Sequence, residues 1–93
     1  MPDRERVLFK AYYRMNQELI LKQIGETISD VVPEKEIVEV GLNDSFKSLG
    51  LNSIERMEIT MLLIEEMEID IQRSELLPAG NFGEMIDIIL SKN

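Results

Sequence analysis

Apolar residues recur at intervals of three and four along most of the chain, which is the period of an amphipathic α-helix. The first such segment begins at Asn16, and its apolar side is formed by Leu19, Ile20, Ile24, Ile28 and Val31. Pro33 ends the segment, because the residue before a proline is disfavoured in the α conformation. The pattern therefore predicts a first helix over residues 16–31.

A long connection follows over residues 32–50, which include the turn-forming residues Pro33 and Gly41. Loops of this length are usually functional or held down by their own side chains. We expect the apolar residues of this loop to pack onto the helices: Ile37, Val38, Val40, Leu42, Phe46 and Leu49.

The second helix has a clear start signal. Asn52 followed by Glu55 is a capping-box pair, in which each side chain bonds to the other residue's backbone N–H. Neither glycine nor proline occurs between this pair and Met67. A second long helix is therefore expected from residue 53 to about residue 67.

The end of the chain predicts one short helix and one longer helix. Residues 73–77 suit a single helical turn before Pro78. Asn81 and Glu84 repeat the capping pattern ahead of a last helix over residues 82–90. The expected fold is all-α: a four-helix bundle with three main helices, one short helix and a long first loop.

The composition is that of a binding or carrying protein more than that of an enzyme. The 93 residues fit one domain, have a net charge of −8 and include neither His nor Cys. The most common general base and the thiol nucleophile are therefore missing. The negative charge argues against nucleic acid and favours partners with basic surfaces. With no apolar run long enough for a membrane, no secretory signal and no EF-hand spacing, we expect a cytoplasmic monomer without a metal site.

The first 14 residues differ from the rest of the chain. Their net charge is +2, against −10 for residues 15–93, and they hold three of the five aromatic residues, Phe9, Tyr12 and Tyr13. We divide the chain into an N-terminal extension (residues 1–14) and a domain (residues 15–93). A tag, a linker and an upstream start codon are all compatible with the extension.

Residues 49–54, Leu-Gly-Leu-Asn-Ser-Ile, contain the best candidate for covalent chemistry. Gly50 allows a tight turn, and Asn52 caps the second helix. Ser53 is then left at the first helical position, where a phosphate on its hydroxyl would lie in the favourable field of unpaired N–H groups. The simpler alternative is that Ser53 is one more capping hydroxyl.

This run closely resembles the phosphopantetheine attachment motif of acyl and peptidyl carrier proteins, Leu-Gly-x-Asp-Ser followed by Leu, Ile or Val. The resemblance covers residues 16–92 and implies the acyl-carrier-protein fold. It also implies that a separate phosphopantetheinyl transferase moves 4′-phosphopantetheine from coenzyme A onto Ser53, with Leu51 and Asn52 beside it in the cofactor site. The thiol of the arm then holds an acyl group as a thioester for partners such as an acyltransferase or a ketosynthase. Asn52 replaces the family's usual Asp and removes a negative charge next to the hydroxyl.

Two apolar stripes run along the expected second helix. One stripe is assigned to the core: Ile59, Leu63 and Met67. The other lies among acidic residues, at positions that form the docking face in carrier proteins. Four residues are therefore assigned to partner recognition: Ile54, Met57, Glu58 and Met61. The alternative is that a central helix buries both stripes.

A narrower resemblance is to the free-standing donor carrier proteins of β-branching cassettes in bacterial polyketide synthesis. It rests on residues 52–56, Asn-Ser-Ile-Glu-Arg, and residues 79–84, Ala-Gly-Asn-Phe-Gly-Glu. In such cassettes the carrier presents an acetyl group to a hydroxymethylglutaryl-synthase-like enzyme. Arg56 is the residue that most suggests this branch, and it is assigned to docking. An arginine at this position is equally compatible with a surface charge that has no recognition role.

Two other functions remain open from the sequence. The first is a carrier protein for fatty-acid synthesis or for an activated amino acid. The second is a small helical adaptor that binds a partner through the Met-rich stripe and is never modified. Binding by the adaptor would not depend on Ser53 or on coenzyme A, whereas loading of a carrier would depend on both.

Overall fold

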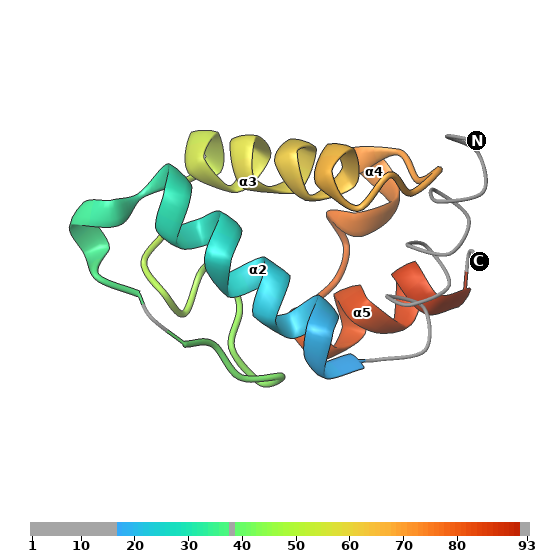
Figure 1. Cartoon of the computed structure of the whole chain (residues 1–93), viewed down its shortest axis with the longest axis horizontal. Helices are drawn as coiled ribbons and strands as arrows, with labels where there is room; N and C mark the ends of the chain where they lie inside the picture. The colour runs from blue at the N-terminus through green and yellow to red at the C-terminus, as the bar shows by residue number, and fades with distance from the viewer. Residues whose placement is uncertain (1–16, 38, 92–93) are drawn as a thin grey trace, which may run out of the picture.

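The structure is a computed structural model, and it describes residues 17–37 and 39–91. It contains four α-helices and one short 3₁₀ helix in these ranges: α2 (Gln17–Val31), η1 (Pro33–Lys35), α3 (Ser53–Glu66), α4 (Arg73–Leu76) and α5 (Phe82–Ser91). Helix α2 packs against both α3 and α5, and the short α4 contacts α3 and α5 (Figure 1). The proposed extension, residues 1–14, lies outside the described residues.

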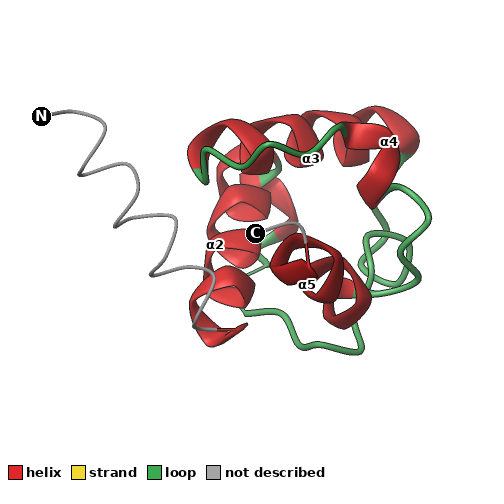
Figure 2. Ribbon diagram, turned by 90° about the vertical axis from the view of Figure 1, so that its right-hand side faces the viewer, coloured by secondary structure: helices red, strands yellow, loops and turns green. Residues whose placement is uncertain are grey.

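The predicted helical architecture is confirmed for the described part of the chain, in which no strand occurs (Figure 2). Helices α3, α4 and α5 begin and end within one or two residues of the predicted bounds. The 3₁₀ helix was not predicted. It follows α2 because Pro33 fits the first position of a helical turn, where no N–H is needed. None of the described helices is long and apolar enough to cross a membrane.

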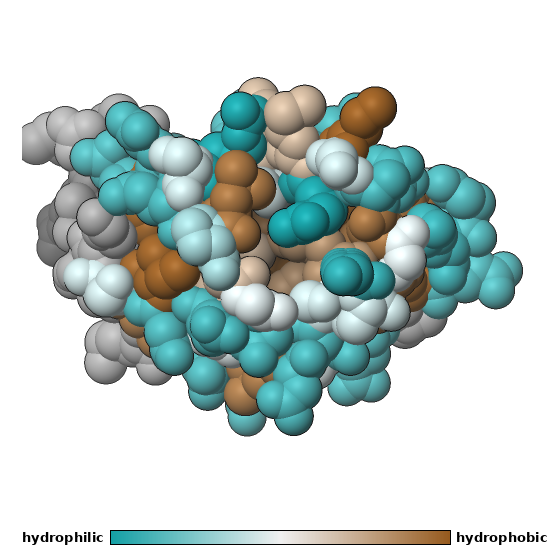
Figure 3. Space-filling view, turned by 180° about the vertical axis from the view of Figure 1, so that it is seen from behind, coloured by the Kyte–Doolittle hydropathy of each residue, from teal (hydrophilic) through white to brown (hydrophobic). Residues whose placement is uncertain are grey.

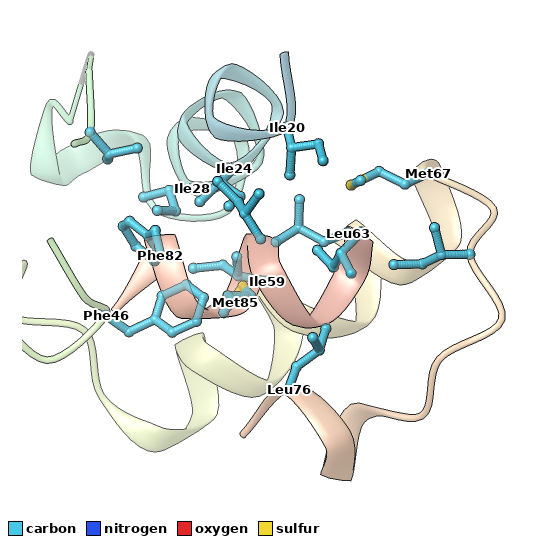
Figure 4. Packing of buried hydrophobic residues seen from close by; sticks show 14 of the residues in the cluster. Ile20, Ile24, Ile28, Phe46, Ile59, Leu63, Met67, Leu76, Phe82 and Met85 are labelled. Carbon is cyan, nitrogen blue, oxygen red and sulfur yellow. The ribbon is translucent and has the colours of Figure 1, made fainter. Parts of the chain in front are cut away.

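The core lies between the three long helices and is formed by one apolar side of each (Figure 4). Every one of the following core residues is less than 4% exposed: Ile20, Ile24, Ile28, Ile59, Leu63, Met67, Leu76, Phe82, Met85, Ile86 and Ile89. Burying an aliphatic side chain of this size contributes about 1.5–3 kcal/mol. The helical period read from the sequence therefore identifies the residues that hold the bundle together.

The long loop packs onto the bundle through some of the predicted residues. Val40 and Phe46 are buried, and Ile37 and Leu49 are half-buried against the core. Leu42 is 38% exposed, so the prediction that it packs inward was wrong. Its backbone carbonyl makes the long-range hydrogen bond described next. Val38 lies outside the described residues.

Two backbone hydrogen bonds tie the loop to the start of α5. The N–H of Phe82 donates to the carbonyl of Asp44, and the N–H of Gly83 donates to the carbonyl of Leu42, each at 2.9 Å. The next N–H, that of Glu84, donates to Asn81 Oδ1 at 2.8 Å. The first N–H groups of a helix have no partner within it, so these bonds satisfy them and fix the loop beside α5.

Candidate functional site

The chain makes a tight turn immediately before α3. The N–H of Gly50 donates to the carbonyl of Lys47 at 3.0 Å, and the N–H of Leu51 donates to the carbonyl of Phe46 at 2.9 Å. This pair of bonds is that of a Schellman motif, in which the next-to-last residue is left-handed. Gly50 has φ +76°, a conformation that costs a residue with a Cβ about 1–2 kcal/mol. Gly50 therefore sets the direction in which the chain enters α3.

The start of α3 is closed by the predicted capping box. Asn52 Oδ1 accepts from the N–H of Glu55 at 2.8 Å, and Glu55 Oε1 accepts from the N–H of Asn52 at 2.9 Å. Ser53 is the first residue of the helix, and its side chain is exposed. Because Asn52 fills the capping role, the interpretation of Ser53 as a capping hydroxyl is not supported. The hydroxyl of Ser53 stands at the positive end of α3, accessible to another molecule.

Leu51 differs from its neighbours at this site. Its side chain is only 6% exposed and belongs to the core cluster. A cofactor beside Leu51 would therefore contact the backbone of this residue and not its side chain. The burial of Leu51 anchors the chain two residues before Ser53, so the exposed serine is attached to a fixed part of the bundle.

Helix α3 presents an exposed apolar stripe that begins next to Ser53. Ile54 is 65% exposed, Met57 39% and Met61 53%, and Glu58 is exposed beside them. By contrast, Ile59, Leu63 and Met67 on the other side of the helix are all 0% exposed. The alternative in which α3 buries both stripes is thus excluded. Figure 3 shows a mainly hydrophilic surface with apolar groups along its upper edge, which α3 forms.

Arg56 does not share this exposed stripe. It precedes Ile59 and Leu63 by three and seven positions, and therefore stands on the core side of α3. Its guanidinium carbon lies 5.9 Å from the centroid of the Phe46 ring. Its Nε is buried and has no hydrogen-bond partner among the described residues. An N–H left in this state costs about 1–3 kcal/mol, so the simple surface charge considered from the sequence does not describe this arginine.

The ring of Phe46 joins the loop, α3 and α5 at this point. It meets the ring of Phe82 edge-on, with centroids 5.1 Å apart and an interplanar angle of 78°. Such pairs contribute about 0.5–1.5 kcal/mol beyond the area they bury. Figure 4 shows both rings beside Ile59 and Met85. Arg56 thus covers an aromatic pair that holds the loop on the bundle.

The described residues contain no group of three or more His, Cys, Asp or Glu side chains that is placed to hold a metal ion. The chemical features of the site are therefore a hydroxyl at a helix start, an exposed apolar stripe and a partly buried arginine. This arrangement places an accessible hydroxyl next to an exposed apolar surface.

A comparison with protein families matches residues 22–89 to the model described as the phosphopantetheine attachment site. The match spans the loop, α3, α4 and nearly all of α5. Such a family match favours a modified carrier over the unmodified adaptor.

Two individual proteins are similar to this chain. The polyketide biosynthesis acyl carrier protein AcpK of Bacillus subtilis (strain 168) is 28% identical over 78 residues, which cover 84% of this chain and 95% of AcpK. A solved structure, described as the curacin biosynthetic pathway HMG synthase in complex with acetyl donor-ACP, matches with a TM-score of 0.73 and 36% identity. That match covers 83% of this chain and 99% of the solved chain.

Proposed function

Because the chain belongs to the carrier protein family defined by a phosphopantetheine attachment site, we propose that Ser53 bears the arm and that the arm carries an acetyl group for polyketide β-branching. The family supplies the cofactor, 4′-phosphopantetheine, which is attached covalently. The thiol of the arm holds an acyl group as a thioester and provides the soft nucleophile that the chain lacks. In this proposal the chain carries the cargo, and its partner enzymes perform the chemistry.

The exposed hydroxyl of Ser53 at the start of α3 is the observation that carries the assignment. In the loading step, Oγ of Ser53 forms a bond to the phosphorus that bears the pantetheine. The bond from that phosphorus to the adenosine-bisphosphate half of coenzyme A breaks, and the hydroxyl proton passes to a base of the phosphopantetheinyl transferase. The N–H groups at the start of α3 favour the phosphodiester that results.

The exposed stripe of α3 is proposed as the partner-docking surface, defined by Ile54, Met57, Glu58 and Met61. Exposed apolar residues beside a reactive group are typical of interaction sites. Methionine side chains adapt to partners of different shape. A net charge of −8 would attract a partner with a basic rim and raise the rate of encounter.

The β-branching role is supported by the names of the two similar proteins. AcpK is described as a carrier of polyketide biosynthesis, and the solved chain as an acetyl donor carrier bound to an HMG synthase. By this likeness the partner that accepts the cargo is a hydroxymethylglutaryl-synthase-like enzyme. The enzymes that load and use the carrier are proposed as a phosphopantetheinyl transferase together with an acyltransferase or a ketosynthase.

A loading assay separates this proposal from a fatty-acid or aminoacyl carrier. The phosphopantetheinylated protein is incubated with acetyl, malonyl and aminoacyl donors and their loading enzymes, and then with a hydroxymethylglutaryl-synthase-like enzyme. We expect the acetyl form to serve as the substrate of that enzyme. Transfer of the malonyl or aminoacyl form by that enzyme, with no transfer of the acetyl form, would contradict the donor role while leaving the carrier function intact.

A further inference from the structure

A small cavity lies between the long loop, the first turns of α3 and the start of α5. Its volume is about 200 Å³, and its lining is Ser45, Phe46, Lys47, Arg56, Ala79, Gly80, Asn81, Phe82 and Met85. Two of these residues are basic and none is acidic, although the chain has 18 acidic residues and 10 basic ones. The charged side chains of the lining are therefore both basic, with the Glu84 carboxylate beside Gly80 at its edge, and the part formed by Lys47 and Arg56 suits an anionic group.

The cavity begins one helical turn from the proposed attachment residue. Ser53 and Arg56 are three positions apart on α3, a spacing that places their Cβ atoms about 5–6 Å apart. Ser53 itself lies between the exposed stripe and the side of the helix that carries Arg56. A group attached to Ser53 can thus reach the cavity without crossing the docking surface.

Arg56 has donor capacity that the protein does not use. Its Nε has no partner among residues 17–37 and 39–91, and its guanidinium is held over the Phe46 ring. A guanidinium is well suited to bind phosphate oxygens, because its N–H groups form a planar fork. The Arg56 guanidinium in the cavity lining is therefore a suitable donor for an anionic group.

We propose that the first segment of the phosphopantetheine arm occupies this cavity, an inference that rests on the attachment of the arm to Ser53. The phosphodiester pairs with Arg56 and Lys47. The two methyl groups of the adjoining pantoyl unit pack against Phe46 and Met85, two of the apolar residues that line the cavity. Sites that enclose a whole drug-sized ligand are about 300–1,000 Å³, so a cavity of 200 Å³ fits a segment of the arm and leaves the thiol end free.

This arrangement has a functional consequence. Holding the base of the arm on the core side of α3 leaves Ile54, Met57 and Met61 uncovered. A partner can then dock on the exposed stripe while the free end of the arm enters its active site. Fixing part of the arm also lowers the conformational entropy that is lost when the complex forms.

The test is nuclear magnetic resonance of the apo protein and of the phosphopantetheinylated protein. We expect loading to shift the amide resonances of residues 45–47 and 79–85, with nuclear Overhauser contacts from the pantoyl methyls to the Phe46 ring and the Met85 methyl. In Arg56→Met, which keeps an unbranched stem and removes the guanidinium and its charge, these contacts should be lost although the protein still loads. Arg56→Lys should keep part of them.

Arg73→Met is the matched control, because Arg73 lies on α4, contacts Met61 Sδ and does not line the cavity. It should leave the arm contacts unchanged. Shifts confined to the immediate neighbours of Ser53 in the loaded wild type would overturn the inference, as would arm contacts that survive in Arg56→Met. A wild-type chain that gains no arm at all would overturn the proposed function first, and intact mass distinguishes the two failures.

Discussion

The two sides of α3 carry the same kinds of residues but have different roles. Ile59, Leu63 and Met67 are completely buried, whereas Ile54 and Met61 are more than half exposed. Side-chain chemistry does not separate the sets, since isoleucine and methionine occur in both. What separates them is their angle on the helix relative to α2, which covers one side only. An apolar residue on α3 thus serves stability on one side and, by our proposal, recognition on the other.

The largest effect on stability is expected on the buried side. Leu63→Ala removes a fully buried side chain from the centre of the core and should cost about 2–5 kcal/mol of the free energy of unfolding. A small domain has only about 5–15 kcal/mol in total, so the variant should unfold at much lower urea concentration. Chemical denaturation measures the difference.

Met61→Ala is the matched control on the exposed side, two positions away on the same helix. Exposed substitutions usually change stability by no more than about 0.5 kcal/mol. Equal losses of stability in Leu63→Ala and Met61→Ala would show that both sides of α3 pack against the bundle. That result would contradict the division of α3 into a buried side and an exposed side.

The next effect concerns recognition. Met61→Glu places a charge in the exposed stripe and should lower kcat/KM for acyl transfer to the partner enzyme about tenfold, the equivalent of about 1.4 kcal/mol. Its urea midpoint should remain that of the wild type. Met61→Leu, which keeps an apolar side chain of similar volume, should transfer normally. Unchanged transfer by Met61→Glu would remove this residue from the docking surface.

A smaller loss of stability is expected when Asn52 is replaced. This residue caps the start of α3 and belongs to neither of its two sides. Asn52→Ala removes the acceptor for the N–H of Glu55 and should cost about 1 kcal/mol. Asn52→Asp keeps the cap and should retain the stability of the wild type or exceed it slightly, because a carboxylate favours the start of a helix. Denaturation of the three proteins under one set of conditions measures this order. An alanine variant as stable as the wild type would show that the capping box contributes nothing.

The helices were predictable because their signals are local. The bounds of α3 and α5 follow from Asn52 and Asn81, whose side chains cap the helices as expected. The inner residues follow from a period that only requires one side of each helix to face the others. Such information is present in short stretches of sequence, and no knowledge of distant contacts is needed.

The environment of Arg56 was not predictable in the same way. The sequence suggested either a docking residue or a surface charge, but the side chain lies over Phe46, ten positions earlier in the chain. One signal was available, because Arg56 continues the buried stripe of Ile59 and Leu63 by one turn. Its partner is set by the path of the long loop, which depends on backbone bonds from Leu42 and Asp44 to α5. Contacts of this kind carry no local pattern, and the exposure of Leu42 was mispredicted for the same reason.

The central claim, that Ser53 is the attachment residue, is tested most directly by intact mass. The wild type and Ser53→Ala are each incubated with coenzyme A, magnesium and a promiscuous phosphopantetheinyl transferase, after circular dichroism has shown both to be helical. We predict one phosphopantetheine-sized gain in the wild type, mapping to the peptide that contains Ser53, and no gain in Ser53→Ala. A folded Ser53→Ala that still gains the arm, or a wild type modified at another residue, would contradict the account.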